Sequence, residues 1–306
     1  MTDLPTSEAP ASSVVMARAT AQESWPSLGA PIKGPTALGN DPRRLIRLAW
    51  TLAFTDIKLR FFGSVLGYLW QLIRPLALFG VLYVVFTQFL SFGQGVKFYP
   101  VALLLGLVLF GFFAEATGQA VRSLVNREPL VRKIDFPRLA VPLATLMTAL
   151  INLGLNLIPV FVFLLASGGR PRLSWLELPL LILGLAAFAG GLAMLLSALF
   201  VRYRDVEPIW EVVLQALFYA APIFYTISVV REKTSQDWIP DAIMFNPFAA
   251  VLQQARHAVI DPSHEDPVSV FGDPLLLLVP IGITVAVLVI GFVVFNRLAP
   301  HIAEEL

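Results

Sequence analysis

Chemistry within a membrane needs converging His, Cys, Asp or Glu side chains, and this sequence offers few of them. It has no cysteine, which excludes a disulfide framework, a thiolate metal site and a cysteine nucleophile. Its three histidines, His257, His264 and His301, form no H-E-x-x-H pattern and lie outside the long apolar runs. We therefore expect no catalytic residues and no bound metal, and a membrane-embedded enzyme is a disfavoured hypothesis.

The segment 126–138, NREPLVRKIDFPR, mixes cationic and apolar residues between two long apolar runs. Such a mixture can form a short helix with an apolar anchor and a charged rim, which suits docking into a groove of a soluble partner. Composition alone favours the plainer interpretation of a charged loop at a membrane surface.

Polar residues within apolar runs are the other candidates for chemistry. An unpaired carboxylate at Glu115 would be costly in lipid, so it faces a channel or a partner, or marks the end of a span. Burial with a hydrogen-bond partner is the favoured interpretation. Asn152 and Asn156 lie four residues apart on one helical face, and such amides more often join helices than bind a ligand.

The composition shows which elements must hold these residues. Of 306 residues, 57% are hydrophobic and only 14% charged, with a mean hydropathy of +0.75, whereas soluble domains carry roughly 25% charged residues. Six apolar segments are each long enough to cross a bilayer. They span about 66–90, 101–121, 139–166, 177–201, 211–230 and 275–297. We therefore predict an all-α membrane protein with six transmembrane helices, and the near-neutral net charge gives no indication of nucleic-acid binding.

The distribution of lysine and arginine predicts the orientation. Thirteen of these residues flank the spans on the side of both termini, and six lie on the other side. By the positive-inside rule, both termini are predicted to be cytoplasmic.

The segments outside the spans differ in character. Residues 42–62 predict an amphipathic interfacial helix, because polar residues recur at three- and four-residue spacing, and the pair Gly63-Ser64 predicts a bend after it. Residues 1–41, rich in Pro, Ala, Ser, Thr and Gly, predict a disordered cytoplasmic tail. The stretch 231–274 predicts an outer loop with a short amphipathic or re-entrant helix, or else a purely solvated loop. Residues 63–300 would form the transmembrane domain.

Five short motifs in the same order give the chain a family resemblance. They are DIKLRFFGSVLGYLWQLIRP (56–75), LVRKIDFPR (130–138), VRYRDV (201–206), APIFY (221–225) and NPFAAVLQQAR (246–256). Together they resemble the ABC-2-type permeases that export polysaccharide, O-antigen and teichoic acid or cell-wall galactan. The resemblance covers about residues 43–297.

This resemblance implies a homodimer in the bacterial cytoplasmic membrane, driven by two copies of a separate ATP-binding subunit and moving a lipid-linked polysaccharide. The sequence has no G-x-x-x-x-G-K-[ST] phosphate loop, so ATP and Mg would be used by that partner and no cofactor by this chain. The family's coupling loop, which docks on the ATPase, maps onto Asn126, Leu130, Arg132, Lys133, Phe136 and Arg138. The interfacial helix would act as an entry gate through its polar residues Arg44, Arg47, Thr51 and Lys58.

Further residues are candidates for the channel. Arg74 stands where the family more often has a small polar residue before Pro75, and it either extends to lipid phosphates or contacts a pyrophosphate of the substrate. Glu115 is a second charged candidate. Because sugar rings stack on aromatic faces, the resemblance also suggests Phe110, Phe113, Tyr219 and Tyr225, although each could instead face lipid or the interface.

Two other transport hypotheses remain open at this point. A proton-coupled transporter could use Glu115 with Arg74, but one carboxylate without an internal repeat argues against it. An ABC-2 permease for a drug or small lipid is the nearer alternative, and the motifs at 56–75 and 130–138 favour polymer export over it.

Overall fold

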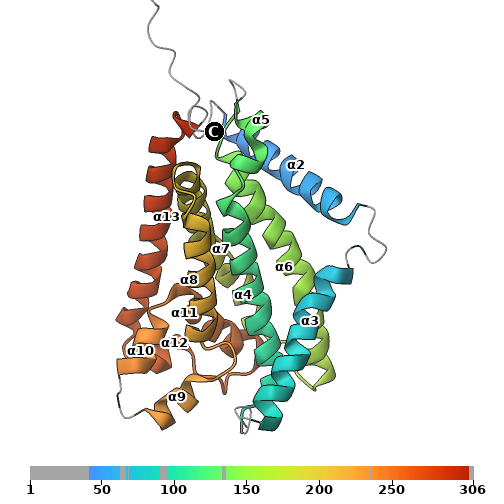
Figure 1. The fold of residues 1–306 in the computed structure, drawn as a ribbon. Helices are drawn as coiled ribbons and strands as arrows, with labels where there is room; N and C mark the ends of the chain where they lie inside the picture. Colours follow the sequence, from blue (N-terminus) through green and yellow to red (C-terminus); the bar gives the residue numbers. More distant parts are fainter. Residues whose placement is uncertain are drawn as a thin grey trace, which may run out of the picture. The chain divides into compact units, whose positions relative to one another are not determined.

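The computed structural model describes residues 41–62, 67, 69–89, 95–132, 136–234, 236 and 238–302, without the side chains of Phe61 and Gln88. Every regular element in these ranges is helical, which confirms the all-α membrane fold (Figure 1). The predicted tail, apart from Asp41, lies outside the described residues. So do the predicted bend at 63–64 and Lys133.

The helices follow one another along the chain with short connections. In order they are α2 (Pro42–Phe61), α3 (Leu69–Val84), η1 (Val85–Phe89), α4 (Tyr99–Val121), η2 (Val125–Arg127), α5 (Glu128–Val131), α6 (Ala140–Ala166), η3 (Leu173–Leu176), α7 (Glu177–Arg202), α8 (Val206–Ala220), α9 (Ile227–Lys233), α10 (Trp238–Met244), α11 (Pro247–Ala255), η4 (Arg256–Ile260), α12 (Pro267–Phe271), η5 (Pro274–Leu277) and α13 (Leu278–Leu298).

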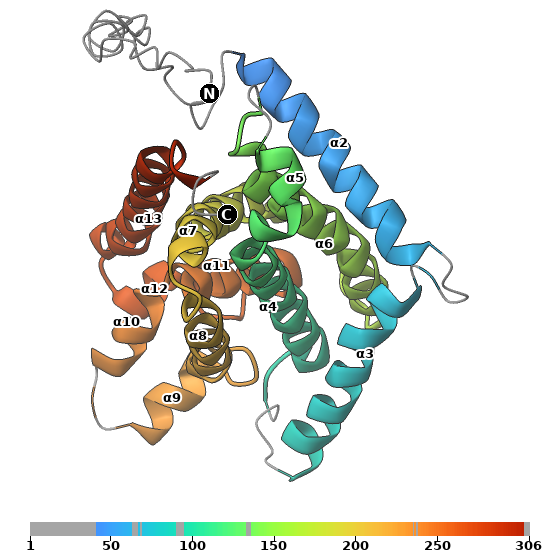
Figure 2. The ribbon, with the colours of Figure 1, turned by 45° about the horizontal axis from the view of Figure 1, so that its top comes forward.

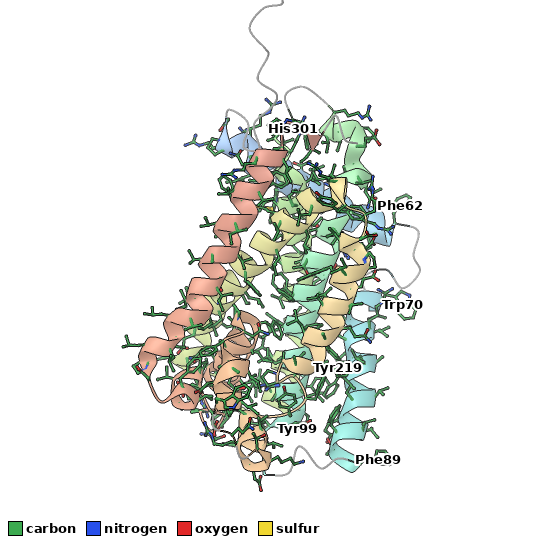
Figure 3. All side chains as sticks on the ribbon, turned by 60° about the vertical axis from the view of Figure 1, so that its left-hand side comes forward. Phe62, Trp70, Phe89, Tyr99, Tyr219 and His301 are labelled. Carbon is green, nitrogen blue, oxygen red and sulfur yellow. The ribbon has the colours of Figure 1, made fainter. Side chains whose placement is uncertain are left out.

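Five helical stretches in the described residues are long and apolar enough to cross a membrane. They are Leu69–Thr87, Tyr99–Val121, Ala140–Ala166, Leu173–Arg202 and Pro274–Leu298. Their ends gather at two ends of the bundle, named here the α5 end and the α9 end. Figure 3 shows Phe62 and His301 at the α5 end and Phe89 and Tyr99 at the α9 end.

The predicted span 211–230 is not one continuous helix, and this part of the prediction is wrong. Its helix α8 begins five residues earlier, at Val206, and stops at Ala220. Residues 221–225 are irregular before α9 begins. Pro222 lacks a backbone N–H and cannot continue the helical hydrogen bonding, so the helix ends just before it. A sixth continuous span is therefore not confirmed.

Helix α4 forms the centre of the bundle. Of its most apolar 18-residue window, 78% is buried, against 0% for the span that contains α3 and 11% for the one that contains α13. A helix that is apolar on all sides must be surrounded by protein or by lipid. Helix α4 is therefore surrounded by protein, packing against α3, α6, α7, α8 and α11. The outer faces of α3 and α13 are left for lipid or another chain.

The stretch before the last span enters the bundle as a short helix. Asn246 caps α11 by accepting a hydrogen bond from the backbone N–H of Phe248 at 3.0 Å. Most residues of α11 and η4 are buried, including Phe248 and Leu252, against α4 and α7. This confirms the short helix before the last span and contradicts a purely solvated loop.

Helix α2 is the predicted interfacial helix, within one residue of the predicted range at its C-terminal end. It lies across the outside of α6 at the α5 end (Figure 2). A buried stripe at four-residue spacing faces the bundle, formed by Leu45, Ala49, Ala53 and Ile57. Exposed Ile46, Trp50 and Phe54 form an apolar face, and exposed Arg44, Arg47, Thr51, Thr55 and Lys58 form a polar one. One helix thus has a buried, an exposed apolar and an exposed polar face, as suits a helix at a membrane surface.

At the α9 end, three connections meet at one carboxylate. Asp261 accepts hydrogen bonds from Lys97 at 2.7 Å and from Arg172 at 3.3 Å. Burial alone would raise the pKa of the Asp261 carboxyl, but hydrogen bonds from Lys97 and Ser263 outweigh it and hold that pKa well below its usual range. The ionised carboxylate therefore ties the segment after η4 to the α3–α4 and α6–α7 connections.

Candidate functional site: a polar cavity between α3, α4 and α6

A cavity of about 830 Å³ lies between α3, α4 and α6, beside the C-terminal end of α2. Its lining residues recur on one face of each helix, as the 3.6-residue period requires. They are Arg60 and Gly67, then Trp70, Gln71, Arg74, Pro75 and Leu78 of α3, then Leu107, Val108, Gly111, Phe112, Glu115 and Gln119 of α4, and finally Leu153 and Asn156 of α6.

Glu115 is the hub of the polar side of this cavity. Its Oε1 accepts hydrogen bonds from Arg60 at 2.5 Å, Asn152 at 2.8 Å and Gln119 at 3.1 Å. Arg60 also donates to Gln119 Oε1 at 2.8 Å. A carboxylate at this depth is stable because cationic and amide donors replace water. The predicted hydrogen-bond partners of Glu115 are present, but its side chain is 15% exposed and therefore only partly buried.

The opposite wall carries a second cation and further polar groups. Arg74 of α3 is exposed, and Trp70 lies one turn before it on the same face of the helix. Figure 3 shows Trp70 at the α2 side of α3. Asn156 Oδ1 is buried on the cavity wall without a hydrogen-bond partner in the described part of the chain. Two guanidinium groups, amides and an indole ring suit an anionic, hydroxyl-rich ligand.

The four predicted aromatic channel residues are not on this wall. Phe110 and Phe113 are packed in the interior of the subunit, where both rings contact Phe248. Tyr219 is exposed on α8, and the hydroxyl of half-buried Tyr225 donates to the Ala220 carbonyl. Composition places aromatic residues in a helix but does not tell which of its faces meets another helix.

The predicted docking residues separate into two groups. Asn126 and Arg132 are exposed at the α5 end, and Leu130 is half-buried. Phe136 and Arg138 are buried, so neither side chain is free to bind a partner in this structure. Phe136 instead packs in an apolar cluster with Val131 and residues of α2, α6 and α13, because the loop folds back onto the bundle. Lys133 lies outside the described residues.

Sequence patterns missed several residues of the site. In the sequence, Arg60 is one more charge before the first apolar run, and nothing local links it to Glu115, 55 positions later. Gln119 carried a usable signal, since it follows Glu115 by four residues and so shares its helix face.

His264 is buried and lies against the backbone. Burial, reinforced by the charge of Arg256, lowers the pKa of His264 to about 4, so the ring is neutral near pH 7. Its Nε2 lies 3.1 Å from the Lys97 carbonyl. Within the described residues, no group of three or more His, Cys, Asp or Glu side chains is arranged to hold a metal ion.

A bundle of several membrane-length helices, with a polar cavity and an amphipathic helix beside it, is the architecture of a multi-pass membrane protein. The chain belongs to the ABC-2 type transporter family, whose model matches residues 47–259. It is 29% identical over 252 residues to an O-antigen export system permease protein, RfbA, of Klebsiella pneumoniae, covering 82% of this chain and 92% of that protein. It is 26% identical over 202 residues to the RfbA of Myxococcus xanthus, covering 66% and 76%. Finally, it is 22% identical over 215 residues to the polysialic acid transport protein KpsM of Escherichia coli, covering 68% and 80%.

Proposed function

We propose that this chain is the membrane-spanning subunit of an ATP-driven exporter that moves a lipid-linked polysaccharide, of the O-antigen, teichoic-acid or cell-wall galactan type, across the bacterial cytoplasmic membrane. The family match and the names of the relatives support an exporter of polysaccharide. The observation that carries the proposal to this chain is the polar cavity between α3, α4 and α6. Beside its apolar residues, the lining contains the guanidinium of Arg74 and the amides of Gln71 and Asn156, which suit a phosphorylated sugar better than a wholly apolar drug or small lipid.

Each part of such a substrate has a matching surface. The lipid phosphates would bind Arg74, whose planar guanidinium donates in pairs to phosphate oxygens. The first sugars would lie against Trp70, Gln71 and Asn156, which supply a ring face and amide groups. The lipid tail would stay in the bilayer along the exposed outer face of α3, where Leu78 and Val81 are exposed. The substrate would thus be bound without leaving the membrane.

A second copy of this chain would complete the pathway. The exposed faces of α3 and α8 carry large apolar side chains, among them Val81, Ile209 and Val212, which lipid or another subunit must cover. A homodimer with the α8 faces inward would enclose the cavities of both copies in one channel and leave the outer face of α3 to the lipid tail. Tyr219 on α8 would then face that channel.

The energy would come from two copies of a separate ATP-binding subunit at the α5 end, which would be cytoplasmic together with both termini. ATP and Mg would be bound there and no cofactor by this chain. The exposed residues Asn126 and Arg132 of the loop 122–138 are suited to dock on that subunit. The exposed polar stripe of α2, including Arg44, Arg47, Thr51 and Lys58, would lie beside the same partner and act as the entry gate.

The function is tested by exchanging Arg74 for leucine in the complex reconstituted with its ATP-binding subunit. We expect export of the lipid-linked polysaccharide to fall about tenfold or more, because one charge-assisted phosphate contact contributes about 1.4 kcal/mol or more. Export into proteoliposomes is the measurement. Arg74→Lys should retain a larger part of it. Arg170→Leu, an exposed arginine at the α9 end, is the matched control. Equal export by Arg74→Leu and its control would exclude the phosphate contact, and no export by the unaltered complex would exclude the proposed function.

Docking is tested by charge reversal at Arg132. Within the described residues, this exposed side chain forms an ion pair only with Glu128 of its own helical turn, at 2.8 Å, so Arg132→Glu should leave the fold intact. We expect weaker association with the ATP-binding subunit and several-fold lower ATP hydrolysis by the assembled complex, because a rim charge mainly changes association. Co-purification and ATPase assays measure both effects. Arg170→Glu is the control at the opposite end, and unchanged co-purification of Arg132→Glu would remove this residue from the interface.

A further inference from the structure

Two ion pairs fasten α2 to two different parts of the bundle. Asp56 pairs with Arg127 of η2, directly before α5 in the proposed docking loop. Arg60 pairs with Glu115 of α4, on the cavity wall, at 2.5 Å. Asp56 and Arg60 are four residues apart, so they lie on one face of α2. A single helix therefore links the docking loop to the cavity.

Apart from the hydrogen bond from Arg60 to Gln119, the rest of the described contact between α2 and the bundle is mainly apolar. Its buried stripe contains the small residues Ala49 and Ala53 between Leu45 and Ile57. Apolar contacts of this kind are not directional, and small side chains interlock little with the neighbouring helix. The position of α2 along α6 is therefore set to a large extent by the two ion pairs.

The surroundings of the Asp56–Arg127 pair favour its staying closed. The Arg127 side chain is only 14% exposed, and its Nη1 is buried without a hydrogen-bond partner in the described part of the chain. Removing Asp56 would leave a largely buried guanidinium with no ion-pair partner among the described residues, which is strongly unfavourable. Hence a displacement of the docking loop should carry Asp56, and α2 with it.

The Arg60–Glu115 pair has the opposite character. Glu115 keeps the amide donors Asn152 and Gln119 when Arg60 leaves, so its carboxylate is not stranded. The Arg60 side chain is already 32% exposed and borders the open cavity, where water or an anionic ligand can receive it. Opening this pair also breaks the hydrogen bond from Arg60 to Gln119 at 2.8 Å, but it strands neither charged group, so this ion pair opens at a lower cost than Asp56–Arg127 does.

We propose that α2 is a lever that converts movement of the docking loop into opening of the cavity. Asp56–Arg127 stays closed and transmits the movement, and Arg60–Glu115 opens in each cycle, so that Arg60 is freed towards the anionic part of the substrate. The proposal rests on the proposed function, and it adds Asp56, Arg60, Arg127 and Glu115 as positioning residues for coupling.

The absence of cysteine from the chain allows a clean test by crosslinking. One variant carries Asp56→Cys with Arg127→Cys, and the other carries Arg60→Cys with Glu115→Cys, each in the full complex with its ATP-binding subunit. A short bis-maleimide reagent with a reducible disulfide spacer joins each pair. Crosslinking 56 to 127 should raise export about tenfold over the same variant untreated, since it restores the coupling that the lost ion pair supplied. Crosslinking 60 to 115 should lower export about tenfold and reduction should restore it.

The outcomes separate the lever from a purely structural role. If both pairs only stabilise the fold, crosslinking either pair will preserve or raise export, and the proposal is overturned. The cysteine-free chain treated with the same reagent is the control, and its export also shows whether the proposed function itself holds. The charge exchange Asp56→Arg with Arg127→Asp provides a second variant, which should export more than either single change. Equal export by all three would likewise overturn the lever.

Discussion

Replacing Arg256 by methionine is expected to destabilise the α9 end of the bundle by several kcal/mol. The Arg256 side chain is fully buried, and its Nη1 and Nη2 donate to the carbonyls of Pro222 and Ile223 at 2.6 Å each. Longer contacts of 3.4 Å reach the carbonyls of Tyr225 and Ala102. Methionine fills similar space but donates nothing, so the two close carbonyls lose partners worth about 1.5–3 kcal/mol each.

These carbonyls need a donor because the helical structure is interrupted at residues 221–225. Pro222 ends α8, and the irregular residues 221–225 expose carbonyl groups inside the bundle instead of pairing them along a helix. A single planar guanidinium bridges the break because it presents several donors in fixed directions. Arg256 is thus a structural substitute for the missing helical hydrogen bonds.

Thermal unfolding of the purified protein measures the effect. Arg256→Lys should be intermediate, because one ammonium group cannot reproduce the geometry of the fork. Arg231→Met is the control, since Arg231 forms an exposed ion pair with Glu265 at 3.0 Å and should cost less than about 1 kcal/mol. If Arg256→Met unfolded at the same temperature as Arg231→Met, the carbonyl groups of residues 222 and 223 would have another hydrogen-bond donor.

The same break explains why one predicted span was wrong. Segment 211–230 is apolar over most of its length, and apolar length is the signal that correctly located α4, α6 and α13. Whether a helix can be interrupted inside a bundle depends on hydrogen-bond donors that satisfy the carbonyl groups freed by the interruption. Here that donor is Arg256, 34 residues beyond Pro222, and no local pattern links the two.

The charged residues of the cavity could be predicted from the sequence, but the positions of the apolar rings could not. Glu115 and Arg74 stood out because a charge within an apolar run is costly and needs an explanation. Phe110 and Phe113 carried no such signal, since an apolar ring is equally stable in the core, in lipid or on a channel wall. Amphipathic spacing, in contrast, predicted α2 almost to the residue because its polar and buried stripes are both local.

The second large effect is expected where α7 and α13 cross. Gly191 and Gly291 face each other there, and the backbones meet so closely that a Cβ on Gly291 would overlap the Gly191 carbonyl oxygen. A Cβ on Gly191 would lie 2.7 Å from the Leu288 Cα. Both obstacles are backbone atoms, which cannot rotate away. Gly291→Leu should therefore force the helices apart and cost about 3 kcal/mol or more.

The position of α13 makes this crossing decisive for the whole bundle. Only 11% of its most apolar window is buried, and it packs mainly against α7. In a bilayer, lipid contacts an apolar helix as well as protein does, so close packing at small residues contributes much of the association. Gly291→Leu should melt at a lower temperature and elute as aggregated or poorly dispersed protein in size-exclusion chromatography. Gly282→Leu on the same helix adds the same side chain where no atom lies within 4 Å of a new Cβ, and it should behave as the parent does. Equal behaviour of the two leucine variants would show that α7 and α13 have room to separate without loss.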